Sequence, residues 1–201
     1  MDALTQKIVA NTYVDREGFK ATNPWFESLK QRGLYPDAVA MDGEISVLRA
    51  IRTVWPKAQV QRCLFHVQRE GMRWLRTHPK TQAGQELKEL LSTLCYVKSF
   101  KERTTFIQAF EQWLERYGQF VQSLPQTEVA FKDLKRTIVL IKNALPDMFR
   151  YFGHSLPATT NALESFYSRL KADYRRHRGL SLMNRIQYLK WYCYYKNSNT
   201  S

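Results

Sequence analysis

The chain has 201 residues, which is enough for one domain of ordinary size or for one domain with a large insertion. Apolar residues make up 44% of it, so a packed core can form and a disordered chain is excluded. Lysine and arginine outnumber the acids by 31 to 18, giving a net charge of +13. This balance favours a polyanionic partner, most commonly nucleic acid, because each neutralised phosphate releases counterions.

The positive charge is concentrated towards the C-terminus, where residues 164–201 carry eight basic and two acidic side chains. The three cysteines are odd in number and widely spaced, so they predict no disulfide framework and fit a reducing, cytoplasmic compartment. The N-terminus lacks the pattern of a signal peptide, and no apolar run has the length of a membrane span.

The first third of the chain predicts alternating strands and helices. The expected elements are a strand over 7–14, a helix over 23–33, a strand over 38–41, a helix from 42 to about 54 and a strand over 59–64. Asn23 is expected to cap the first helix, with Pro24 at its first position and Gly33 at its end. Strands and helices in this order indicate an α/β sheet with short strands.

The middle of the chain, from 67 to about 152, shows only helical spacing, with leucine and aromatic stripes that predict an all-helical insertion. Pro146 is expected to end its last helix. Beyond Pro157, apolar residues at spacings of three and four predict a helix that Gly179 stops, and a final helix covers 182–197. The expected division is therefore 1–66 for the α/β core, 67–155 for the insertion and 156–201 for returning core helices.

Two carboxylates stand at positions where metal chemistry is common. Asp42 follows a short buried strand, and the carboxyl ends of strands in α/β sheets are where ligands bind. The alternative role for Asp42 is the N-cap of the next helix. Glu164 lies in the first turn of a helix that becomes basic further along, which suits a site that holds a phosphodiester. Its alternative role is a capping box in which Asn161 is the N-cap.

A Cys-x-x-His pair, Cys63 and His66, follows the second core strand. Zinc fingers use such pairs, but they require a matching second pair. The remaining cysteines and histidines (His78, Cys95, His154, His177 and Cys193) supply no properly spaced partner pair. A buried, hydrogen-bonded cluster beside an active site is therefore favoured over structural zinc. The chain also lacks a Gly-rich phosphate loop, a nucleophile elbow and a dinucleotide fingerprint.

These features together resemble the Mutator-like bacterial insertion-sequence transposases, which use Asp-Asp-Glu chemistry on a ribonuclease H-like fold. The matching stretches are DAVAMDGEISVLRAIRTVWPKAQVQRCLFHVQRE and TTNALESFYSRLKADYRRHRGLSLMNRI. The resemblance makes Asp42 the second catalytic carboxylate and Glu164 the third. Cys63 and His66 carry the family's QRC-x-x-H signature, and Asn161 belongs to its Thr-Asn-x-x-Glu element.

The resemblance implies Mg²⁺- or Mn²⁺-dependent DNA cleavage and strand transfer at transposon ends and target DNA, in a prokaryotic, nucleoid-associated protein. Asp42 and Glu164 would be metal ligands. Four cations on the last basic helix would contact DNA phosphates: Lys171, Arg175, Arg176 and Arg178. The alternative for these cations is a solvated helix face. A homo-oligomer, or assembly with an intact transposase, is a further implied partner.

One departure from the family concerns its first catalytic Asp, which lies on an earlier strand. In the family two further strands follow that strand before the helix that precedes Asp42, and only about twenty residues precede this helix here, too few for those strands, so the expectation is a fragment, a split reading frame or a decayed element. A competing function is then a non-catalytic DNA-binding or dimerising remnant of a transposase. A third possibility is a helical interaction scaffold, which predicts no salt-sensitive DNA binding.

Overall fold

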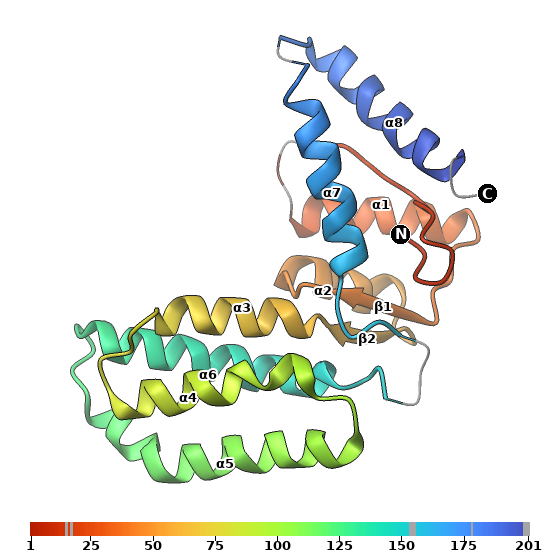
Figure 1. Ribbon diagram of the computed structural model, residues 1–201. Coiled ribbons are helices and arrows are strands. Elements are labelled where there is room, and N and C mark those ends of the chain that lie inside the picture. The colour runs from red at the N-terminus through yellow and green to blue at the C-terminus, as the bar shows by residue number, and fades with distance from the viewer. Residues whose placement is uncertain (15, 17, 153–155, 178, 199–201) are drawn as a thin grey trace. The chain divides into compact units, whose positions relative to one another are not determined.

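The computed structural model describes residues 1–201 except 15, 17, 153–155, 178 and 199–201 (Figure 1). Within these described residues the chain is helix-rich and has one small sheet of two parallel strands. The elements in chain order are α1 Phe19–Gln31, β1 Ala38–Met41, α2 Ile45–Val54, β2 Gln59–Arg62, α3 Leu64–Leu75, α4 Gln82–Ser92, the 3₁₀ turn η1 Leu94–Tyr96, α5 Phe100–Ser123, α6 Val129–Met148, α7 Asn161–Tyr174 and α8 Leu182–Ser198. The predicted helix-rich α/β class is confirmed at this level.

The chain forms two compact units. Unit 1 comprises residues 1–37, 44–58 and 160–201, and therefore holds α1, α2, α7 and α8. Unit 2 comprises residues 38–43 and 59–159, and therefore holds both strands and the helices α3 to α6. The three-part division predicted from the sequence stays a prediction.

Unit 2 is a helical array attached to the small sheet. Strands β1 and β2 pair in register from Ala38 opposite Gln59 to Met41 opposite Arg62. The backbone N–H of Cys63 donates to Met41 O at 2.8 Å, which extends the pairing by one bond. Helices α3 to α6 follow one another side by side (Figure 1) and enclose a continuous apolar core. Its largest fully buried members are Leu64, Leu87, Leu91, Leu94, Phe110, Leu134, Ile141 and Met148. The all-helical character predicted for this stretch is confirmed.

A buried glutamine joins the sheet to the end of the helical array. The side-chain amide of Gln61 donates to Met148 O at 2.6 Å, and its carbonyl accepts from the backbone N–H of Tyr151 at 2.9 Å. The hydroxyl of Tyr151 donates to Val97 O at 2.6 Å, and burial raises the pKa of Tyr151 to about 12. Because buried polar groups are costly unless they are bonded, these contacts fix strand β2 to the C-terminal end of α6.

Unit 1 has two apolar clusters. In the first, α1 packs on α2 around Leu29, Val54 and Trp55, and the Trp55 indole donates to Leu34 O at 2.9 Å. In the second, α7 packs on α8 around four buried side chains, Ile8, Phe166, Leu170 and Cys193. The N-terminal segment joins this second cluster, because the Asn197 side chain exchanges two hydrogen bonds with the backbone of Ile8.

The strand predicted over 7–14 is wrong, because the described residues there form no strand. Its β-forming side chains Val9, Tyr13 and Val14 are exposed, and the backbone of Ile8 pairs with the Asn197 side chain and not with another strand. β-Propensity reflects packing on a sheet surface, and no such surface covers this segment.

Several predicted helix ends also differ from the structure. Helix α1 begins at Phe19, so Asn23 is not its cap and Pro24 lies inside it. Pro146 is likewise inside α6, within its last turn. Helix α7 ends at Tyr174, ahead of Gly179, which adopts a left-handed φ of 87° in the turn beyond. Helix α8 occupies the predicted range almost unchanged.

Candidate functional site

Asp42 lies directly after strand β1, at the carboxyl end of the parallel pair. Its side chain is exposed, whereas the preceding Met41 is buried. The alternative role predicted for Asp42, as the N-cap of α2, is wrong. That role belongs to Glu44, whose carboxylate accepts from the Ser46 backbone N–H at 3.0 Å and from the Ser46 hydroxyl. These hydrogen bonds also lower the pKa of Glu44, with the Ser46 hydroxyl as the largest cause.

Arg62, which the sequence patterns did not single out, contacts the loop that carries Asp42. Its Nη1 donates to Gly43 O at 2.9 Å, and its side chain is largely buried at the end of β2. Burial lowers the pKa of Arg62, while the nearby charges of Asp42 and Asp147 act in the opposite direction. Since Asp147 is itself buried, the guanidinium is placed to neutralise two carboxylates in unit 2.

Gly43 is the residue that allows this approach. A Cβ added there would lie 1.5 Å from Arg62 Nη1, and the φ of Gly43 is 97°, in the region that disfavours any side chain. A glycine is therefore required after Asp42, because any side chain at residue 43 would overlap the Arg62 guanidinium that packs against the loop. No local pattern in the sequence marks Arg62, because an arginine that ends a strand of mostly polar residues is ordinarily solvated.

Cys63 and His66 come together at the start of α3. Cys63 is fully buried and is the N-cap residue, and His66 is half-buried in the first turn. The Cys63 sulfur and a ring nitrogen of His66 lie within 4.8 Å of each other. The neighbouring Leu64 N–H donates to Ala158 O at 3.0 Å, so this corner is fixed to the segment that follows the helical array. Thiol and imidazole are both metal ligands, and the pair adjoins the strand end that carries Arg62.

Glu164 occupies the first turn of α7, in unit 1. The helix begins at Asn161, which is exposed, and its N-cap residue is Thr160, so the capping box predicted with Asn161 as cap is wrong. Glu164 accepts instead from the Thr160 hydroxyl at 3.1 Å. The carboxylate is half-buried at the positive end of the helix dipole, where a negative charge is stabilised.

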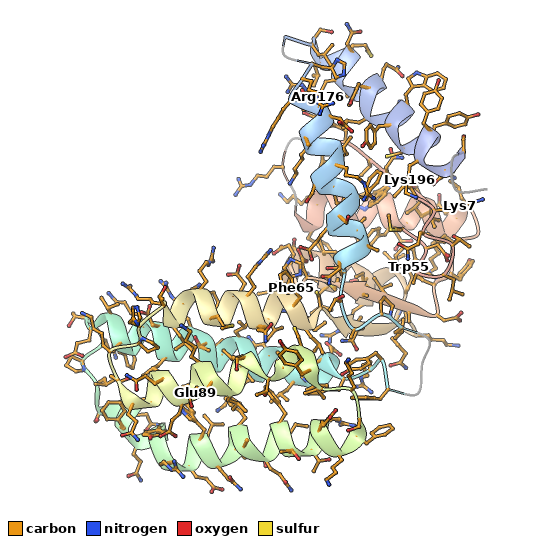
Figure 2. All side chains as sticks on the ribbon, in the orientation of Figure 1. Lys7, Trp55, Phe65, Glu89, Arg176 and Lys196 are labelled. Carbon is orange, nitrogen blue, oxygen red and sulfur yellow. The ribbon has the colours of Figure 1, made fainter. Side chains whose placement is uncertain are left out.

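The predicted DNA-contacting cations lie at and beyond the C-terminal end of α7. Lys171, Arg175 and Arg176 are exposed, and Arg175 is the C-cap residue. Arg176, labelled in Figure 2, forms an ion pair with Asp173 at 3.6 Å and remains 80% exposed. Arg178 lies outside the described residues. Because the helix ends at Tyr174, these cations share a helix end and the following turn, and not one continuous helix face.

Residues 5–180 match the family model described as transposase, Mutator family. The match covers most of the chain, and the chain therefore belongs to this family of transposases. No curated protein and no solved structure gives a significant match. Family membership makes DNA transposition the process in which the chain takes part, with DNA as its partner. No helix in the described part of the chain is long and apolar enough to span a membrane.

Proposed function

We propose that the chain is a catalytic core of a transposase that cleaves DNA strands and transfers them to target DNA, with Asp42 and Glu164 as its acidic catalytic residues. The observation that carries the proposal is the family match, which includes both carboxylates and the Cys63–His66 pair. Two structural features support it. Asp42 stands at a strand end without serving as a helix cap, and Glu164 stands in a helix first turn.

The donor set fits a hard divalent cation. Carboxylate oxygens are the ligands that Mg²⁺ and Mn²⁺ prefer, and Asp42 is exposed while Glu164 is half-buried. A metal bound by these residues would supply a nucleophilic hydroxide and charge stabilisation for the leaving oxygen. We propose a ribonuclease H-like core for this site, with residues 67–155 as its helical insertion.

The remaining residues have supporting roles in the proposal. Arg62 holds the loop through Gly43 and so positions the Asp42 carboxylate. The backbone N–H groups of Cys63 and Leu64 hold the corner between β2 and α3, through Met41 O and Ala158 O, and so position the Cys63 and His66 side chains beside the strand ends. Lys171, Arg175, Arg176 and Arg178 bind backbone phosphates, which positions the duplex without reading its sequence.

Neutral isosteres test the catalytic assignment. Asp42→Asn and Glu164→Gln are each expected to lower strand transfer at least about a hundredfold, because a metal ligand is removed while side-chain volume is kept. The assay is Mg²⁺-dependent cleavage and joining of terminal-repeat DNA, with duplex binding measured in parallel. Binding is expected to change less than about twofold.

Asp37→Asn is the matched control, since Asp37 is an exposed carboxylate at the opposite end of β1. If the Asp42→Asn and Glu164→Gln variants carry out strand transfer as efficiently as the Asp37→Asn control, the catalytic assignment is refuted. If the unmodified chain binds DNA and cleaves none, the non-catalytic, DNA-binding or dimerising role applies instead.

A further inference from the structure

Helix α8 presents aromatic side chains that its own unit does not use for packing. Trp191, Tyr194 and Tyr195 are each more than half exposed, at 54%, 59% and 58%. They are spaced three and four residues apart and so share one side of the helix. The Trp191 ring centroid lies 5.5 Å from that of Tyr194 and 5.8 Å from that of Tyr195. We call these three residues the aromatic face of α8.

The opposite side of α8 already supplies the contacts that hold the helix in unit 1. Cys193 is buried against α7, and Tyr188, Leu189 and Tyr192 pack around it. The Tyr192 hydroxyl donates to Asp173 at 2.8 Å, and Asn197 binds the backbone of Ile8. The aromatic face therefore adds little to the stability of unit 1. Exposed apolar side chains that do not stabilise the fold commonly mark a binding surface.

The charge of the helix indicates which partner would cover this face. Residues 182–198 contain Arg185, Lys190 and Lys196 and no aspartate or glutamate. Lys190 is exposed and lies one helical turn before Tyr194. Lys196, labelled in Figure 2, follows Tyr195 near the end of the helix. Planar rings with adjacent cations and no anions are the features with which proteins bind single-stranded nucleic acid.

We propose that the aromatic face of α8 binds unpaired bases of single-stranded DNA by stacking, with Lys190 contacting the adjacent backbone. Duplex DNA cannot use this face, because its bases are already stacked on one another. The family match ends at residue 180, so the face lies beyond the matched region. The inference rests on the proposed function in taking DNA as the ligand, and it adds a separate site for strands that are unpaired during cleavage.

The test compares a short labelled oligothymidine with a labelled hairpin duplex by fluorescence anisotropy, using the full chain in EDTA. The Trp191→Ala/Tyr194→Ala/Tyr195→Ala variant is expected to bind the single strand at least about tenfold more weakly, since stacking contributes on the order of fivefold or more per base. Its duplex affinity is expected to fall less than about threefold. Trp191→Phe, which keeps a ring, should retain most of the single-strand affinity.

The control is Tyr96→Ala/Phe100→Ala, which removes two exposed aromatic side chains from unit 2. The proposal is overturned if the triple variant binds the single strand normally or loses both ligands equally. It is also overturned if light scattering shows that the triple variant loses a dimer, because a second copy of the chain would then occupy the face. Both affinities are measured in EDTA, where no metal-dependent cleavage takes place, so failure of the catalytic assignment would change neither of them and remains distinguishable.

Discussion

Four residues at the carboxyl ends of β1 and β2 show how much of the candidate site follows from local sequence and how much does not. Asp42, Cys63 and His66 could be selected because each has a recognisable position relative to a strand end. Arg62 could not, because an arginine at the end of a strand is ordinarily solvated. Its buried positive charge is favoured by the negative charges of two carboxylates from separate parts of the chain, Asp42 after β1 and Asp147 near the end of α6. The sequence does not reveal this arrangement, because only the folded chain brings the two carboxylates near Arg62.

The close approach of Gly43 and Arg62 predicts a specific stability effect. Gly43→Ala is expected to destabilise unit 2 by more than about 2 kcal/mol, since the left-handed backbone alone costs about 1–2 kcal/mol and the new Cβ overlaps the guanidinium. The measurement is the urea midpoint of unfolding by circular dichroism. In an Arg62→Ala background, Gly43→Ala is expected to lower the free energy of unfolding only by the backbone strain of about 1–2 kcal/mol, because the guanidinium is gone.

An equal cost for Gly43→Ala in both backgrounds would show that the guanidinium is not what excludes a side chain at residue 43. The double-mutant comparison is informative because it holds the backbone strain constant.

At the level of elements, periodicity predicted the helices well and capping chemistry predicted their ends poorly. The stripes of α4, α5 and α6 were sufficient because each stripe meets an apolar neighbour in the structure. The predicted strand over 7–14 depended on a partner strand outside the local window, whereas the predicted caps at Asn23, Asp42 and Asn161 are wrong because each helix has another residue as its N-cap. Glu44 and Thr160, one or two residues away, occupy two of these cap positions.

The capping box of α5 provides a test of helix-end chemistry. Ser99 accepts from the Glu102 backbone N–H at 3.2 Å, and Glu102 accepts from the Ser99 backbone N–H at 2.9 Å. Ser99→Ala is expected to destabilise unit 2 by about 1 kcal/mol in thermal unfolding, because a helix donor loses its partner. Ser123→Ala, at the other end of α5, serves as the control, and a similar loss there would contradict the explanation.

The same box predicts a pH dependence. Hydrogen bonds from Lys98 N–H and then Ser99 lower the pKa of Glu102 below its ordinary value of 4.5. A carboxyl group whose folded pKa is lowered stabilises the fold above the ordinary pKa, and this contribution is lost as pH falls through the lowered value. Glu102→Gln is therefore expected to be less stable than the unmodified chain at neutral pH, with the difference shrinking below about pH 4 in denaturation curves. A difference that stays constant with pH would contradict this assignment.

At the level of the whole molecule, charge and family agree on the partner. The excess of 31 basic over 18 acidic side chains predicted nucleic acid, and the Mutator-family match makes that partner DNA. The structure describes Asp42 within unit 2 and Glu164 within unit 1. Their joint action on one metal was predicted from motif order and resemblance, since spacing along a chain does not determine how separate segments meet. It stays a prediction that the strand-transfer assay addresses.

The exposed cations at and beyond the C-terminal end of α7 predict a salt-dependent contribution to duplex binding. Lys171→Gln/Arg175→Gln/Arg176→Gln is expected to weaken binding similarly for all sequences and to reduce the slope of log affinity against log salt by about 0.9 for each phosphate that the protein no longer neutralises. Arg176 should contribute least, because it already pairs with Asp173. Titrations at several salt concentrations measure the slope.

Lys98→Gln/Lys101→Gln/Lys142→Gln removes three exposed cations from unit 2 and serves as the charge-matched control. If both triple variants change the slope equally, binding follows net charge alone and no phosphate-binding role belongs to the end of α7.

The Gln61 hydrogen bonds have a consequence for the order in which unit 2 assembles. Gln61 and Met148 are 87 residues apart, and the intervening chain forms the helices α3 to α6, of which α3, α4 and α5 pack on their sequence neighbours while α6 packs chiefly on α3. Neighbouring helices can form early because the loops they close are short, whereas the bridge from Gln61 must wait until the chain has returned. We therefore expect the bridge from Gln61 to be among the last contacts of unit 2 to form, so that strand β2 is joined to the end of α6 only after the helices between them are in place.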